Sequence, residues 1–126
     1  MKKLLSFVLI SCLPLIASTS FAADTLMNAD QIKKLVAGKT ITAKHNLKGF
    51  KFTVYFDKDN KTALRKQKGN TIKTSYSMKG NMHCLLWKGQ DRCANIRDNK
   101  DGTYSRMSPK GKAIITWSKI TDGKSL

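Results

Sequence analysis

Turn signals return at short, regular intervals along most of this chain of 126 residues. Clusters of Gly, Asn, Asp and Lys, such as Lys68-Gly69-Asn70 and Lys79-Gly80-Asn81, separate apolar stretches at intervals of about 8–12 residues. This spacing is typical of a β-sandwich or a small barrel. The turns are too short to contain the crossover helix that joins parallel strands, so we expect an antiparallel sheet.

The stretches between the turns alternate apolar and polar residues, as strands with one buried face do. The clearest alternation is in 50–56, where Phe50, Phe52, Val54 and Phe56 share one face. The chain is therefore predicted to be mainly β, a small meander barrel or a sandwich, without a second domain. We expect about eight strands, at 39–45, 50–56, 61–67, 71–78, 82–87, 91–97, 103–107 and 112–120, with a frayed end at 121–126.

One short helix is predicted ahead of the strands, at 28–37. Asn28 is a favourable N-cap, and Gln31, three residues later, completes the capping-box pattern. Ile32 and Val36 share an apolar face. Because so short a helix needs a partner surface, we expect it to cover an end or an edge of the sheet.

The first 22 residues have the layout of a secretory signal peptide. A basic start is followed by an apolar run at 4–17 and a stretch of small and polar residues at 18–23. We place cleavage after Ala22, which leaves a single β-rich domain at 23–126. The mature protein is then expected in the periplasm or outside the cell, without a transmembrane span.

A lipoprotein signal is the alternative interpretation of this segment. Leu9-Ile10-Ser11-Cys12 resembles a bacterial lipobox, in which Cys12 is lipidated and becomes the first residue. The apolar run before Cys12 is short, and 13–16 would remain as an apolar tail. Ordinary cleavage after Ala22 is therefore favoured.

Two cysteines, Cys84 and Cys93, remain after cleavage, and an even pair in an exported chain predicts a disulfide. If Lys88-Gly89 is a two-residue turn, counting outward places Cys84 opposite Cys93 on a non-hydrogen-bonded pair, at a Cα separation of ~4.5 Å. The chain has no C-x-x-C motif, so we expect a structural bridge and no redox chemistry.

The charge balance is strongly basic, with 24 Lys and Arg against 8 acidic residues and a formal net charge of +16. Such a surface attracts an anionic partner such as lipopolysaccharide, anionic lipid or an acidic protein. Export argues against nucleic acid as the physiological partner. Most of the cations are lysines, which favours diffuse, salt-sensitive attraction over bidentate recognition. The residues predicted to form an anion-binding patch are Lys51, Arg65, Lys66, Lys68 and Lys73.

These observations favour an exported, non-enzymatic binding protein with a basic surface, without a cofactor or a metal. One alternative is a carrier of a small ligand, with a barrel interior lined by Phe50, Phe52, Val54 and Tyr76.

A second alternative is a small secreted hydrolase of the nuclease kind. His45 and His83 would then form an acid–base pair. They are the two histidines of the chain, and each is otherwise read as an ordinary strand residue.

The hairpin Cys84-Leu85-Leu86-Trp87-Lys88-Gly89 through Cys93, together with the aromatic stretch Phe52-Thr53-Val54-Tyr55-Phe56, resembles small exported bacterial proteins of uncharacterised function. Those proteins have an N-terminal helix and a Cys-x-x-Trp…Cys hairpin. The resemblance covers most of the mature chain, including Asp101-Gly102-Thr103-Tyr104 and Gly111…Trp117. It implies a β-domain with the disulfide, and it supplies no catalytic residue.

Overall fold

The computed structural model describes residues 26–126. The predicted signal peptide at 1–22, the cleavage site after Ala22 and Cys12 lie outside the described residues.

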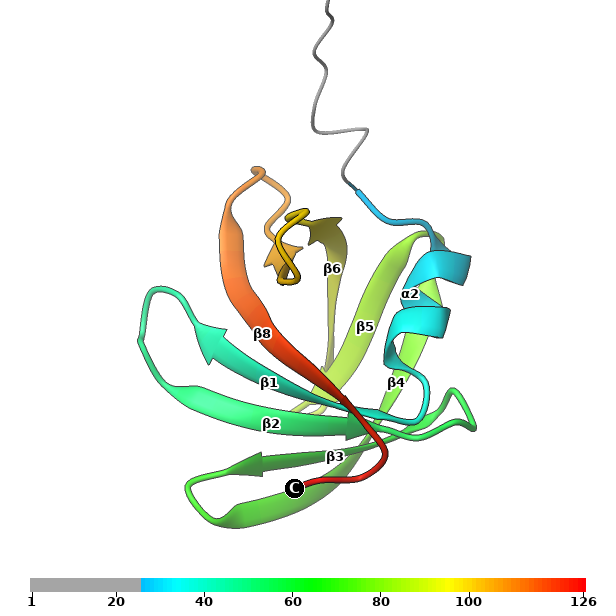
Figure 1. Ribbon diagram of the computed structural model, residues 1–126, viewed down its shortest axis with the longest axis vertical. Coiled ribbons are helices and arrows are strands. Elements are labelled where there is room, and N and C mark those ends of the chain that lie inside the picture. Colours follow the sequence, from blue (N-terminus) through cyan, green and yellow to red (C-terminus); the bar gives the residue numbers. More distant parts are fainter. Residues whose placement is uncertain (1–25) are drawn as a thin grey trace, which may run out of the picture.

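Eight antiparallel strands form a closed barrel in which each strand pairs with its neighbour along the chain and the last pairs with the first (Figure 1). The prediction of a mainly β, antiparallel fold is confirmed, and of its two forms the barrel is the one observed. The strands are β1 (Lys39–His45), β2 (Lys51–Phe56), β3 (Thr62–Gln67), β4 (Asn70–Lys79), β5 (Met82–Trp87), β6 (Gln90–Asp98), β7 (Tyr104–Met107) and β8 (Ala113–Asp122).

Alternation along the strands builds the core, because every second side chain points into the barrel. Phe52, Val54 and Phe56 of β2 are all buried, as the pattern predicts. Ala43 lies opposite Phe52 on one side and Trp117 on the other, so a small residue separates two rings. Because the sheet closes on itself, none of the eight strands in the described part of the chain presents an open edge.

The helix α2 (Ala29–Val36) begins as predicted, with a capping box. The side chain of Asn28 accepts a hydrogen bond from the backbone N–H of Gln31, and the side chain of Gln31 accepts one from the N–H of Asn28. Asn28 and Ala37 have extended backbones, so the helix is one residue shorter at each end than the predicted 28–37. Its buried residues, Ile32 and Val36, belong to the barrel core.

Backbone contacts place α2 at one end of the barrel, which we call the helix end. Met27 N–H donates to Ile96 O, Gly38 N–H donates to Phe56 O, and Ala29 N–H donates to the side chain of Asn81. The turns β2–β3, β4–β5 and β6–β7 lie at this end. The four other turns, which include β1–β2 and β3–β4 at the left of Figure 1, lie at the opposite end.

The C-terminal segment differs from the prediction, because 121–126 is not frayed. Strand β8 continues to Asp122, and Gly123 N–H then donates to Gly38 O at 2.9 Å. The hydroxyl of Thr40 donates to Gly123 O at 2.7 Å and accepts from Ser125 N–H at 2.9 Å. Contacts with residues more than 80 positions away hold this segment in place. The local alternation of apolar and polar residues cannot predict such contacts.

The β5–β6 hairpin has the predicted register and the predicted disulfide. Lys88 and Gly89 have φ angles of 52° and 77°, which fits the two-residue type I′ turn that matches strand twist. Cys84 lies opposite Cys93 at a Cα separation of 3.9 Å, and the two are bonded. The short separation is that of a non-hydrogen-bonded pair.

Removal of this bridge is expected to lower stability moderately. The Cys84→Ser, Cys93→Ser double variant should lose about 2–3 kcal/mol of unfolding free energy, because the bond restricts the unfolded chain over a small loop. Urea denaturation followed by tryptophan fluorescence measures the change, with the bridged wild type as reference. An unchanged urea midpoint would contradict the stabilising role.

Candidate binding site in the barrel interior

A cavity of about 540 Å³ occupies the part of the barrel interior away from α2. Lys48 in the β1–β2 turn, Lys88 in the β5–β6 turn and Pro109 in the β7–β8 turn lie at its border. We call the barrel end formed by the turns β1–β2, β3–β4, β5–β6 and β7–β8 the mouth. The apolar lining comes from several strands and includes Phe50, Phe52, Val54, Leu85, Trp87, Ile115 and Trp117.

The polar part of the lining is almost entirely basic. Arg65, Arg92 and Arg106 line the cavity from three different strands. Asp91 is the one acidic residue of the lining within the described chain, and its carboxylate lies 3.4 Å from the ammonium of Lys79. The three guanidinium groups are therefore not neutralised by carboxylates of residues 26–126.

Arg65 is held between two aromatic rings. Its guanidinium carbon lies 3.9 Å from the ring centre of Phe52 and 4.1 Å from that of Trp87, so cation–π attraction fixes its plane. Its Nη2 donates to Gln67 at 3.0 Å, whereas its buried Nε–H has no partner among the described residues. Burial and, secondarily, the charge of Arg92 lower the pKa of Arg65.

Arg106, on β7, is 8% exposed, as is Arg65. Its Nη1 donates to Nδ1 of His83 at 2.7 Å, and its Nη2 donates to the carbonyl oxygens of His83 and Arg92 at 3.2 and 2.8 Å. These bonds use three of the five N–H donors of a guanidinium. Burial, followed by the charge of Arg65, lowers the pKa of Arg106 to about 10.

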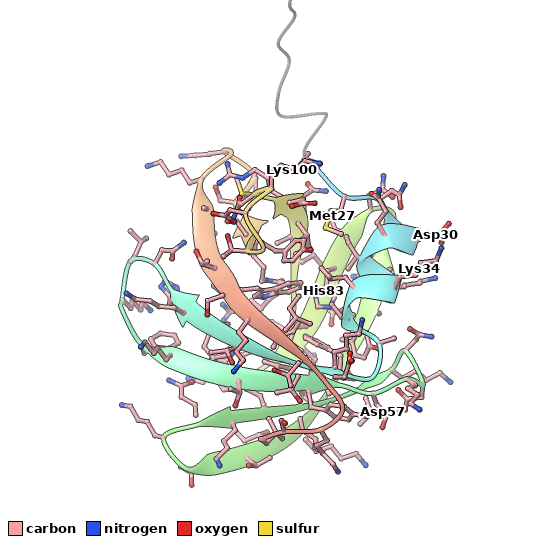
Figure 2. All side chains as sticks on the ribbon, in the orientation of Figure 1. Met27, Asp30, Lys34, Asp57, His83 and Lys100 are labelled. Carbon is pink, nitrogen blue, oxygen red and sulfur yellow. A yellow bond between two sulfur atoms is a disulfide. The ribbon has the colours of Figure 1, made fainter. Side chains whose placement is uncertain are left out.

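His83 is fully buried, and Figure 2 shows its side chain near the middle of the barrel. Its ring packs against Phe56, Trp117 and Tyr76, with centroid distances of 5.0, 5.6 and 5.7 Å. Burial and the charge of Arg106 lower the pKa of His83 well below its usual value, so the ring is neutral at physiological pH. A neutral ring that accepts at Nδ1 carries its proton on Nε2, so His83 orients Arg106.

The predicted anion-binding residues divide between two faces of the barrel. Lys51 and Lys73 are exposed, Lys66 is half-buried, and Lys68 is exposed in the β3–β4 turn. Arg65 points into the interior and does not join these lysines. Alternation along the strand could have predicted that Arg65 and Lys66 lie apart, because adjacent residues on a strand point to opposite faces of the sheet.

The residues predicted to line a carrier interior are mostly at the cavity. Phe50, Phe52 and Val54 line it. Tyr76 is buried in the aromatic cluster instead and donates its hydroxyl to Asp57 O at 2.6 Å. The sequence does not predict that Trp87, Arg92 and Arg106 line the cavity. Alternation along a strand divides its residues between two faces, and only closure of the sheet decides which face is the interior.

The two histidines do not come together. His45 is the last residue of β1, at the mouth, and His83 is the second residue of β5, which starts at the helix end. Nδ1 of His45 accepts from Lys48 N–H at 3.1 Å, and burial lowers the pKa of His45. Within residues 26–126, no group of three His, Cys, Asp or Glu side chains is placed to hold a metal ion.

Comparisons with protein-family models, with curated proteins and with solved structures find no match for this chain. Across residues 26–126, no helix has both the length and the apolar character needed to cross a bilayer. The disulfide is compatible with a periplasmic or secreted protein.

The neutral, buried His83 predicts that stability falls in mild acid. Its pKa is lower in the folded protein than in the unfolded chain, where it is near 6.5, so below pH 6.5 the unfolded chain binds a proton that the folded protein does not. Between pH 7 and 5 the loss should reach about 2 kcal/mol of unfolding free energy. Urea midpoints across this range measure it.

Two single variants distinguish the source of the pH dependence. His83→Gln, which keeps an acceptor for Arg106, should flatten the profile between pH 7 and 5. His45→Gln should keep most of it, because His45 is much less buried than His83. Equal profiles for the wild type and His83→Gln would show that His83 does not cause the effect.

Proposed function

We propose that this protein is a non-enzymatic, periplasmic or secreted binding protein that holds a small anion with an apolar body inside the barrel. The observation that carries the proposal is the cluster of Arg65, Arg92 and Arg106 around one cavity, without a neutralising carboxylate among the described residues. The proposal combines two hypotheses from the sequence, namely an anionic partner and a small ligand carried in the barrel interior.

Electrostatics favours an anion at this position. Burying a charged group away from water is costly unless an opposite charge or good hydrogen bonds compensate it. Arg65 and Arg106 have lowered pKa values because of burial and because other guanidinium groups of the same cluster lie nearby. A carboxylate, sulfonate or phosphate in the cavity would relieve both costs and would accept hydrogen bonds that are stronger than neutral ones.

The walls favour an apolar body on that anion. Phe50, Phe52, Trp87 and Trp117 present rigid aromatic surface, and Leu85 and Ile115 add aliphatic surface. A volume of about 540 Å³ lies within the usual range of small-molecule sites. The proposal assigns binding and no chemical step, because the interior histidine is neutral and bonded to Arg106.

Paired probes test the proposal, namely dodecanoate against dodecanol and 1-naphthoate against 1-naphthalenemethanol. Each pair shares an apolar body and differs in charge. We expect the anion of each pair to bind more tightly by isothermal titration calorimetry. Arg65→Met should weaken dodecanoate binding about 10–100-fold, because a charge-assisted hydrogen bond is lost and the volume is retained.

Lys66→Met is the matched control, since it removes the same charge from the adjacent residue, whose side chain is outside the barrel. It should change the affinity for dodecanoate less than about threefold, as expected for an exposed, screened charge. The proposal fails if the alcohols bind as tightly as the anions, or if the two variants weaken binding equally.

A further inference from the structure

The turns at the mouth carry only positive charge. They contain five lysines and no aspartate, and the chain has no glutamate. No ion pair is found for any of these lysines within residues 26–126. The five are Lys48, Lys68, Lys88, Lys110 and Lys112, at least one in each of the four turns, and all are exposed.

The acidic residues gather at the other end. Six of the seven described aspartates lie in α2, in the turns of the helix end or at strand ends that lead into it, and Asp91 is the exception. In Figure 2, Asp30 and Asp57 lie on the side of the helix, away from the β1–β2 turn. The six are Asp30, Asp57, Asp59, Asp98, Asp101 and Asp122. The barrel therefore has a purely basic end and a mixed end.

The basic end also exposes apolar side chains. Leu47, in the β1–β2 turn, is 84% exposed, the most of any large hydrophobic residue described. Ile72, at the start of β4 beside the β3–β4 turn, is 48% exposed. An isolated surface leucine needs no explanation. A leucine projecting from a ring of unpaired lysines combines the two attractions that hold proteins at a membrane surface.

We propose that the mouth docks on a bilayer that contains anionic lipid, with Leu47 inserted among the acyl chains and the five lysines at the headgroups. The charge asymmetry favours this orientation, since six carboxylates offset the lysines of the helix end and none offsets those of the mouth turns. Lysine suits this role because it is a compact point charge that needs no fixed partner geometry. A bilayer is favoured over an acidic protein because Leu47 and Ile72 are the only large hydrophobic residues exposed at this end among residues 26–126, which is little apolar surface for a shaped partner.

Docking by the mouth goes beyond the proposed ligand and does not depend on it. In the docked orientation the entrance of the cavity points toward the lipid. The residues chosen to test docking do not line the cavity: Leu47, Lys68, Lys110 and Lys112. Loss of lipid binding with retained dodecanoate binding, or the reverse, therefore separates this inference from the proposed function.

Sedimentation with vesicles of phosphatidylcholine, with and without phosphatidylglycerol, is the test. The wild type should bind the anionic vesicles and release them at high salt. The Lys68→Gln, Lys110→Gln, Lys112→Gln triple variant should partition on the order of 100-fold more weakly. A second triple variant, Lys34→Gln, Lys61→Gln, Lys100→Gln, removes the same charge from the helix end and should lose less than about fivefold.

Leu47→Ser tests the apolar component and should weaken partition about 10-fold. The Lys→Arg form of the mouth triple variant should retain binding, and matching circular dichroism melts show that each variant folds. Equal losses in the two lysine triple variants would overturn the proposal in favour of diffuse attraction. Binding to immobilised polyglutamate without binding to anionic vesicles would overturn it in favour of an acidic protein.

Discussion

Pairing between β1 and β8 closes the sheet, and closure gives every strand one face toward a common interior. Side chains fill the interior next to α2, where the core is mostly apolar, and the rest of the interior is the cavity, as the width of an eight-stranded barrel allows. Arg65 and Arg106 point into the same space, where hydration is reduced and guanidinium groups repel one another. Cation–π contacts with aromatic rings stabilise the buried guanidinium of Arg65, and a hydrogen bond to the neutral ring of His83 stabilises that of Arg106. Neither guanidinium is paired with a carboxylate of the described residues. The cavity is therefore basic because closure of the sheet turns alternate residues of each strand inward, and these include the three arginines.

Local patterns were sufficient for the strands, the helix cap and the hairpin register. Each depends on residues close in sequence, such as Asn28 with Gln31 or Cys84 with Cys93 across a two-residue turn. The course of the C-terminal segment was not predictable, because its partners Gly38 and Thr40 lie at the start of the barrel.

The candidate site was only partly predictable for a related reason. The aromatic face of β2 was anticipated, and Phe50, Phe52 and Val54 do line the cavity. The basic composition predicts one surface patch that includes both Arg65 and Lys66, although neighbouring residues on a strand point to opposite faces of the sheet. Nothing local marks Arg106 as interior, because β7 is four residues long and its neighbours Ser105 and Met107 are buried as well. Only the pairing of Arg106 with Ile96 and Ile115 shows its direction.

We propose that the interior cluster of arginines receives the charged group of an apolar anion. A crystal structure of the protein with dodecanoate is the decisive test of this role. We expect an acyl chain between Phe52 and Trp117, with its carboxylate within hydrogen-bond distance of the guanidinium of Arg65 or Arg106. An empty cavity at saturating dodecanoate, or a carboxylate bound only by lysines on the outer surface, would contradict it.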